Sequence, residues 1–387
     1  MSLSFLTDDE NAIRDAARSL IGREIAPHST EYDQHGIFPR GNMEVLGEHG
    51  YLGMIVAPEL GGSGASYLAQ TLVVECLAEV DPATAVIFEV HNSLHIEALW
   101  RFGSSDQKDR WLPNLCRGRT IGAFALSESE AGSNAAALAT RAMVVDGGYR
   151  LTGRKMFITG GGQADQYLVF ATVNPDAGSK GITAFVVQKD AIGISFGPAM
   201  NKMGIRAATT AEVILDDVFV PESDRLGQEG QGYLMALYLL DGGRIGIAAQ
   251  GLGIMAQALS RSLQYARERR QFGRTIGEFE GVQWRLANMA TDLHAARLMT
   301  YEAARHREDG PAGRPLFAMA KLFSSEHAVR HAEDAIQIFG GYGYMTEFGV
   351  ERLLRDAKVT EIYEGTSEIM RLVIASQLLK DYDLDNI

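Results

Sequence analysis

Hydrophobic and polar positions follow three different patterns along the chain. From about residue 7 to 120, apolar residues recur at intervals of three and four, which is the helical period. Thr7 and Glu10 have the spacing of a capping box and predict the start of the first helix. Further helical runs are expected after Tyr67 and from 91 to 102, separated by the glycine-rich breaker PELGGSGAS at 58–66.

The pattern changes between about residues 121 and 226. The stretch from 140 to 162 predicts a hairpin around Asp146, Gly147 and Gly148. Three further strand-like runs come after it, with turn residues between them: YLVFATV, GITAFVVQ and AEVILDDVFVP. The long helical crossovers of a parallel sheet are absent, so the segment predicts an antiparallel sheet and disfavours a Rossmann domain.

The helical period then returns and continues toward the end of the chain. Two apolar stripes at three-and-four spacing mark long helices, one with Leu252, Met255, Leu259 and Leu263 and one with Val282, Leu286, Met289 and Leu293. The expected architecture is multidomain α+β. It comprises an N-terminal helical domain at 1–120, a middle antiparallel β domain at 121–226 and a C-terminal domain like a four-helix bundle at 227–387.

Composition narrows the classes of function. The net charge of −13 disfavours nucleic acid and anionic membranes as partners. No window approaches the roughly 20 apolar residues of a membrane span, and the first residues lack a targeting pattern. A cytoplasmic protein is therefore expected, with a mitochondrial matrix form that lacks its presequence as the alternative. The two cysteines, Cys76 and Cys116, have no spacing typical of a disulfide framework or a zinc site.

Two motifs favour structural interpretations. GGSGAS at 61–66 lacks the lysine of a phosphate-binding P-loop, and a surface loop that caps a helix fits it better. His91 and His95 lie one helical turn apart, as metal ligands do, but no third ligand is evident. We therefore expect these histidines to pack or to line a pocket, and we expect no metal.

Several segments remain ambiguous on their residues alone. FALSESEAGSN at 124–134 and MFITGGG at 156–162 suit either capped turns or a flavin or phosphate site. RERRQFG at 267–273 and QIFGGYGY at 337–344 suit either helix ends or contacts to a ligand or another subunit. Glu364, in IYEGTSEIM, reads as a solvent-facing residue before a helix capped by Thr366 or Ser367.

Taken together and in order, these segments resemble the acyl-CoA dehydrogenase family over essentially the whole chain, and a short-chain or short-branched-chain member most of all. The resemblance implies an FAD enzyme. It assigns the first flavin segment to Phe124, Leu126, Ser127 and Ser133, and the second to Phe157 and Thr159. It further implies contacts to the FAD of a neighbouring subunit, in a homotetramer, from Arg269, Gln271, Phe272, Gln337, Gly340 and Gly341.

The resemblance also implies the reactive residues. Glu364 matches the catalytic base, and burial in an apolar site would raise its pKa. Gly365 would let the thioester approach, while Thr366 and Glu368 match positions that contact the cofactor. Substrate contacts are implied for Asp241, Arg244 and Ser133; a single arginine there would supply local positive charge.

Three departures from the family pattern matter. Ser129, Glu130 and Asn134 are unusual in the first flavin segment and leave its loop shape open. Phe157 stands where a tryptophan is common. In the branch that includes the isovaleryl enzymes, the base comes from the bundle helix, and Gly243 at that position makes that branch a poor match.

The expected reaction is α,β-dehydrogenation of a short or branched acyl-CoA, or of a carrier-bound acyl thioester, to a trans-2-enoyl thioester. An electron-transferring flavoprotein is the expected electron acceptor. A flavin oxidase or monooxygenase of the same fold, and a noncatalytic helical scaffold, remain as alternatives.

Overall fold

The computed structural model describes residues 5–381 and opens with a helical layer. Thr7 caps the first helix as expected: its hydroxyl accepts from the Glu10 N–H at 3.2 Å, and the Glu10 carboxylate accepts from the Thr7 N–H at 2.8 Å. The helices are α1 (Asp8–Glu24), α2 (Ser29–His35), α3 (Arg40–Glu48), α4 (Tyr67–Val80), α5 (Pro82–Glu89), a π-helical segment (Val90–Ile96), α6 (Glu97–Phe102) and α7 (Ser105–Cys116).

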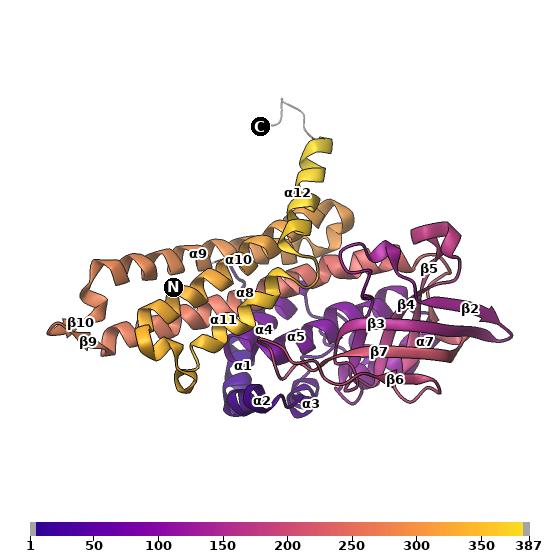
Figure 1. Ribbon diagram of the computed structural model, residues 1–387, viewed down its shortest axis with the longest axis horizontal. Helices are drawn as coiled ribbons and strands as arrows, with labels where there is room; N and C mark the ends of the chain where they lie inside the picture. The colour runs from indigo at the N-terminus through magenta and orange to yellow at the C-terminus, as the bar shows by residue number, and fades with distance from the viewer. Residues whose placement is uncertain (1–4, 382–387) are drawn as a thin grey trace.

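A twisted β-sheet comes next, and it lies at one end of the elongated molecule (Figure 1). The predicted hairpin is confirmed, with Gly147 in the turn between β2 and β3. The strands are β1 (Gly122–Ala125), β2 (Arg141–Val145), β3 (Gly148–Thr159), β4 (Gln166–Thr172), β5 (Ile182–Gln188), β6 (Ile194–Phe196), β7 (Thr210–Pro221) and β8 (Arg225–Leu226). Their order is β6-β7-β3-β2-β4-β5-β8, with β1 beside β4.

The expectation of a purely antiparallel sheet is wrong at two pairings, both of which involve β4. β1 pairs with β4 in parallel, with Phe124 opposite Leu168, and β2 touches β4 in parallel at Arg141 and Thr172. The connection from β1 to β4 contains the whole β2–β3 hairpin, so it is long enough for the chain to re-enter the sheet in the same direction. A short strand such as GAFA carries no sequence signal of its direction.

The third part is a bundle of long helices: α8 (Gly232–Glu268), α9 (Glu280–Arg305), α10 (Arg314–Phe339), α11 (Glu351–Ala357) and α12 (Ser367–Asp381). Each predicted apolar stripe lies on one helix, the first on α8 and the second on α9. At the opposite end of the molecule from the sheet, β9 (Arg270–Gln271) and β10 (Arg274–Thr275) form a small hairpin between α8 and α9 (Figure 1). The expected divisions at residues 120 and 226 fall after α7 and at the end of β8, and they stay predictions.

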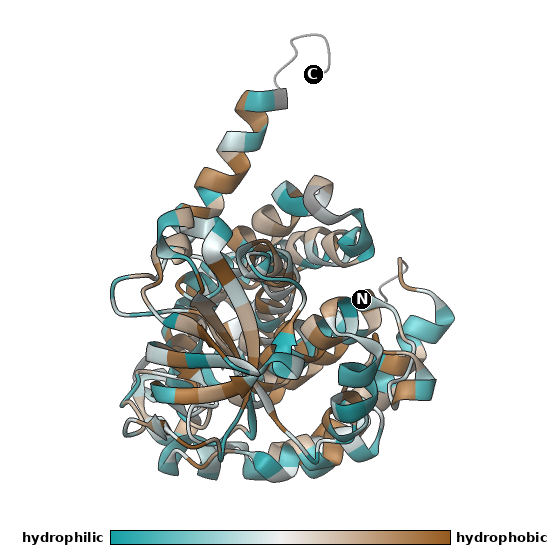
Figure 2. Cartoon of the chain, turned by 90° about the vertical axis from the view of Figure 1, so that its right-hand side faces the viewer, coloured by the Kyte–Doolittle hydropathy of each residue, from teal (hydrophilic) through white to brown (hydrophobic). Residues whose placement is uncertain are grey.

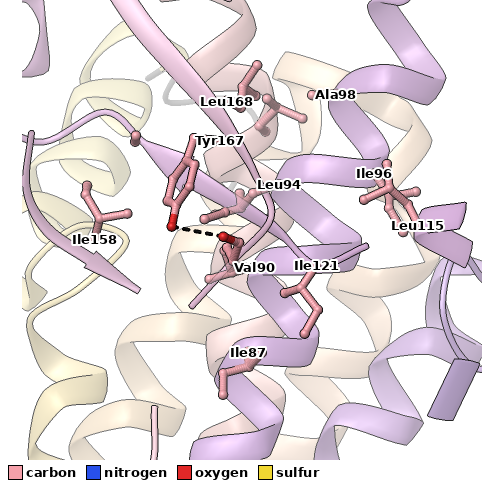
Figure 3. Packing of buried hydrophobic residues seen from close by; sticks show 14 of the residues in the cluster. Ile87, Val90, Leu94, Ile96, Ala98, Leu115, Ile121, Ile158, Tyr167 and Leu168 are labelled. Carbon is pink, nitrogen blue, oxygen red and sulfur yellow. Dashed lines mark hydrogen bonds between the residues drawn. The ribbon is translucent and has the colours of Figure 1, made fainter. Parts of the chain in front are cut away.

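One continuous apolar core joins the first helices to the sheet. Ile87, Val90 and Leu94 pack among side chains of the sheet that include Tyr167 and Leu168 (Figure 3). A second core fills the bundle and includes Leu68 and Leu72 of α4, so α4 contributes to both. The candidate active site lies where these packed layers meet.

The two histidines fasten β1 to the π-helical segment, which confirms the packing interpretation. His91 accepts from the Gly122 N–H at Nδ1 and donates from Nε2 to the Leu115 carbonyl, at 3.0 and 3.1 Å. Nδ1 of His95 lies 3.0 Å from the carbonyl oxygen of Ala123, within hydrogen-bond distance. Burial lowers the pKa of His91 to about 3, so its ring is neutral.

The last helix leaves the body of the protein. α12 projects away from the bundle in Figure 1, and it carries brown, hydrophobic bands along its length in Figure 2. Leu372, Leu378 and Leu379 are exposed on it. Within the described residues, no helix is both long enough and apolar enough to cross a membrane.

Candidate active site

Glu364 lies in a sharply bent segment between a 3₁₀ turn (Lys358–Glu361) and α12. Its φ of 52° is in the left-handed region that a side chain with Cβ rarely adopts, and Gly365 comes next with a φ of 103°. Thr366 then caps α12, since its hydroxyl accepts from the Ile369 N–H at 3.3 Å. The bend turns the carboxyl of Glu364 toward α8 instead of into solvent.

A glycine of α8 makes room for this carboxyl. A Cβ at Gly243 would lie 1.6 Å from Oε2 of Glu364, so the carboxyl occupies the volume that any other residue at 243 would need. Oε2 is enclosed and has no hydrogen-bond partner among the described residues. The solvent-facing position that the residues alone favoured for Glu364 is therefore wrong.

Burial raises the pKa of Glu364 to about 7, against the lowering effects of Glu89, Lys321 and Arg244. Lys321 is itself fully buried on α10, and its ammonium donates to the Gly365 carbonyl at 2.7 Å. The same cation therefore holds the backbone beside the base and supplies a nearby positive charge. A carboxyl with this pKa is well suited to accept a proton near neutral pH.

Asp241 and Arg244 form a buried ion pair on α8, with Arg244 Nη1 2.6 Å from Asp241 Oδ1. Asp241 also pairs with Arg314 of α10 at 2.9 Å. The Asp241 carboxylate therefore offsets the charge of Arg244. The net positive charge of one is shared by Arg244, Asp241 and Arg314 together. Arg314 is the most exposed member of this trio, which we call the Asp241 trio.

The two segments expected to form one flavin site are joined by hydrogen bonds. The Met156 N–H donates to the Ser127 carbonyl at 2.8 Å. The fully buried Lys155 donates to the Leu126 carbonyl at 3.1 Å and to the Glu128 carboxylate at 2.7 Å. This carboxylate also accepts from the Ala139 and Thr140 N–H groups, so it fixes the loop between β1 and β2.

The unusual residues of this loop do not disturb that anchoring. Ser129 and Glu130 lie exposed in a tight turn that two main-chain hydrogen bonds between Glu128 and Ala131 close, at 3.1 and 3.2 Å. Asn134 is exposed as well, and so is Ser133 beside it. The loop shape that the sequence left open is set by Glu128.

An irregularity in β3 presents the aromatic residue of the second segment. The pairing of β3 with β7 shifts register between Lys155 and Ile158, which marks a β-bulge. Phe157 sits in this bulge with a φ of 60° and is 65% exposed. Thr159 ends the strand half-buried, as do Phe124 and Ser127 on the neighbouring segment, whereas Leu126 is buried.

A second group of expected cofactor residues lies far from the first. Arg269, Gln271, Gly340 and Gly341 line one pocket of about 440 Å³ where the β9–β10 hairpin meets the end of α10. Gln337 and Phe272 are exposed beside this pocket in the chain but do not line it. The hairpin is at the opposite end of the molecule from the sheet (Figure 1), so the two groups do not meet within one chain.

Three charged residues of the site were not expected from the sequence: Glu89 and Lys321, which act on Glu364, and Arg314, which belongs to the Asp241 trio. Each is a charge placed inside an apolar helical run or at a helix start, as in TAVIFEVHN and AMAKLF. The charge of Glu89 inside the apolar run of TAVIFEVHN is the sequence signal that could have marked it as a residue of the site. Glu368, by contrast, is exposed in the first turn of α12.

The structural interpretation of the GGSGAS loop is confirmed. In the GGSGAS loop, the Ser66 hydroxyl accepts from the Ala69 N–H at 3.1 Å and caps α4. Among residues 5–381, no group of three or more histidine, cysteine or acidic residues is arranged to hold a metal ion. Both cysteines are free and buried.

Comparisons with known proteins agree with this architecture. The profiles of the acyl-CoA dehydrogenase N-terminal, middle and C-terminal domains match residues 7–119, 123–218 and 230–379. An acyl-CoA dehydrogenase of Bacillus subtilis is 43% identical over 97% of this chain and 99% of its own length. A short-chain-specific acyl-CoA dehydrogenase of Clostridium acetobutylicum is 39% identical over 97% and 99%.

A solved structure shows the same likeness in three dimensions. Butyryl-CoA dehydrogenase from Megasphaera elsdenii superimposes with a TM-score of 0.94, at 39% identity over 98% of this chain and 100% of that one. The three-part fold, the match of all three domain profiles and these relatives lead to one conclusion. The chain is an oxidoreductase that belongs to the acyl-CoA dehydrogenase family, whose members are FAD flavoproteins that dehydrogenate acyl-CoA.

Proposed function

We propose that this protein dehydrogenates a short or branched acyl-CoA, or a carrier-bound acyl thioester, to the trans-2-enoyl thioester, with Glu364 as the base. The observation that carries the proposal is the carboxyl of Glu364. It is enclosed against Gly243, it has a pKa raised by burial, and it lies on a backbone bend that Gly365 and Lys321 support.

The residues of the two flavin segments fit FAD. Phe157 offers an exposed aromatic face at a bulge, and Thr159, Ser127 and Ser133 offer hydroxyls around it. We assign these residues, with Phe124 and Leu126, to the flavin of the same chain. Thr366 and Glu368 are assigned to the same cofactor from the start of α12. When bound, FAD supplies the acceptor for the hydride that leaves Cβ of the substrate.

In the proposed reaction Glu364 takes the pro-R α-proton of the thioester. The Cα–H bond breaks as the proton moves to a carboxylate oxygen of Glu364, and the electron pair that remains forms the new double bond. The N–H of Glu364 is the protein's donor to the thioester carbonyl, an oxyanion-type contact that makes the α-proton more acidic. Gly365 leaves space for the thioester because it carries no side chain.

The short acyl group of the proposal is supported by two relatives named for short-chain and butyryl substrates. For the rest of the substrate we assign Asp241, Arg244 and Ser133. The Asp241 trio carries one net positive charge in a strongly acidic protein, and Arg314 brings that charge toward solvent. Such a charge would favour an anionic carrier such as CoA.

We further propose a homotetramer with an electron-transferring flavoprotein as the electron acceptor. Arg269, Gln271, Phe272, Gln337, Gly340 and Gly341 are assigned to the FAD of a neighbouring subunit. These assignments are supported by the position of the 440 Å³ pocket, which lies at the opposite end of the molecule from the sheet. Residues that far apart in one subunit cannot contact the same flavin.

The test is an anaerobic titration of the purified FAD-loaded protein with a panel of acyl-CoA thioesters of different length and branching. Bleaching of the flavin by one group of thioesters is the expected result. No bleaching by any thioester would contradict the proposal. Oxygen consumption without an added acceptor would favour the oxidase or monooxygenase alternative instead.

Replacing the base tests its assignment separately. Glu364→Gln keeps the size of the side chain and removes its ability to accept a proton, so the variant is expected to retain FAD and to lose bleaching. Normal bleaching by this variant would rule out Glu364 as the base.

A further inference from the structure

A second carboxyl, that of Glu89, is buried beside Glu364 and takes no part in the proton transfer proposed for Glu364. Glu89 ends α5 just before the π-helical segment, and its side chain is 0% exposed. As a carboxylate, Glu89 finds no hydrogen-bond donor for either oxygen among the described residues, and no described cation lies within ion-pair distance of it. An unpaired carboxylate in such a place is strongly disfavoured.

The long bundle helix brings the two carboxyls together. A Cβ at Gly243 would meet Glu364, and a Cβ at Gly246 would lie 2.3 Å from Cγ of Glu89. Residues three apart share one face of a helix, so the two glycines form adjacent recesses, one for each carboxyl. The two side chains approach within reach of a direct hydrogen bond.

The charged and titratable groups around the pair decide where its proton resides. Lys321 and Arg244 act on Glu364 and favour its ionised form. Around Glu89, in contrast, the neighbours are other acids and phenols. They are Glu364 itself, Glu97, which is paired with Arg307, and the phenols of Tyr67 and Tyr363, with the Ser93 hydroxyl also nearby.

Burial, together with the charge of Glu364, raises the pKa of Glu89 well above its usual range. Two carboxyls in contact cannot both be ionised in a dry site, so they share one proton. Since the cations lie on the side of Glu364, the proton belongs to Glu89. Its O–H can then donate to the carboxylate of Glu364.

We propose that Glu89 is a positioning residue of the active site, whose neutral carboxyl donates a hydrogen bond to the Glu364 carboxylate and so keeps the base ionised and oriented. This inference rests on the proposed role of Glu364. During the reaction Glu89 keeps its proton, and the substrate proton goes to Glu364. The hydrogen bond is strongest before that transfer, when Glu364 is charged, so its loss would make the resting base easier to protonate.

Two variants of nearly equal volume separate the hydrogen bond from simple packing. Glu89→Leu removes the donor, so the pKa of Glu364 is expected to rise, and the acid limb of the bleaching rate should move up by about one to two pH units. At a fixed pH on that limb the rate falls roughly 10- to 100-fold and recovers at higher pH. Glu89→Gln keeps an N–H donor, so its acid limb should stay within about half a pH unit of the native one.

Glu75→Gln serves as the matched control. Glu75 is as buried as Glu89, but it pairs with Arg297 at 2.7 Å and accepts a hydrogen bond from Tyr301. Its replacement is expected to lower the unfolding temperature and to leave the pH profile in place. A structural effect of losing a buried acid is thereby distinguished from an effect on the base.

Two results would overturn the proposal. A shift of the acid limb to lower pH in Glu89→Gln would overturn the proposal, because it would mean that native Glu89 is ionised. Unchanged profiles in both Glu89 variants would overturn it as well.

An infrared difference spectrum of native protein minus Glu89→Gln at pH 7 gives an independent readout that needs no substrate. The C=O stretch of a protonated carboxyl is expected in the native spectrum, and its absence would contradict the inference. If this band is present but no thioester bleaches the flavin, the proposed function fails while the carboxyl pair stands.

Discussion

Gly243→Ala is the sharpest test of where the base lies. The substitution adds one methyl group on the face of α8 that Glu364 meets, and that methyl carbon would lie 1.6 Å from Oε2. To reach 3.0 Å, the shortest contact that such atoms ordinarily make, the carboxyl oxygen must withdraw by about 1.4 Å. The carboxyl can yield because it ends a flexible side chain, whereas α8 is packed on both sides.

The expected loss of rate comes from that displacement. A misplacement of about 1 Å in a reacting group can cost on the order of 100-fold in rate, so the bleaching rate should fall at least that much. Stability should not fall in parallel, because alanine in a helix interior is favoured over glycine by roughly 0.5–1 kcal/mol. The variant is therefore expected to be folded, yellow and nearly inactive.

The assay is the rate of flavin bleaching at saturating acyl-CoA in an anaerobic stopped-flow experiment, with FAD content and thermal unfolding measured on the same samples. Gly22→Ala is the matched control, since a Cβ at this exposed position of α1 meets nothing within 4 Å. It should gain a little stability and keep the native rate. A Gly243→Ala protein that bleaches within about twofold of the native rate would refute the placement of Glu364.

Three further predictions concern charge. The bleaching rate should rise about tenfold per pH unit up to about pH 7 and level off above it, because Glu364 accepts a proton only when ionised and its pKa is about 7. A flat rate profile from pH 5 to 8 would contradict this. Lys155→Met leaves the Glu128 carboxylate buried without its cation, so the free energy of unfolding should drop by on the order of 3 kcal/mol and FAD content should fall, as urea unfolding and absorbance would report. Arg314→Gln removes the net charge of the Asp241 trio, so KM for acyl-CoA should rise roughly 2- to 5-fold with kcat unchanged. The difference in KM between the variant and the native protein should shrink at high salt. A fall in kcat alone would show that Arg314 does not act through substrate binding.

Much of the fold can be predicted from local patterns. The capping box at Thr7, the hairpin around Gly147 and the apolar stripes of α8 and α9 all lie where the sequence predicts them. These features are decided by neighbours within about one or two turns of chain. The parallel pairing of β1 with β4 was not predictable, because it joins residues 122–125 to residues 166–169 and depends on the path of the loop between them.

The site shows the same division between local and distant information. The bend at Glu364 and Gly365 could be suspected from the glycine and the cap after it, but the recess at Gly243 could not. Likewise, the pairing of Asp241 with Arg244 is a three-residue spacing on one helix, whereas Arg314 joins them from another helix 73 positions away. The charges that reach the site from other elements are the part that the sequence alone does not reveal.

The π-helical segment Val90–Ile96 makes the active site sensitive to a kind of change that point mutagenesis does not probe. A π turn holds one residue more than the α-helical path it replaces. That surplus lets Glu89 face α8 while His91 and His95 fasten β1. Deleting one residue here would restore a regular helix and rotate α5 by about 100° relative to α6. The length of this segment is therefore constrained from two sides, by α8, which Glu89 faces, and by β1, which the two histidines hold.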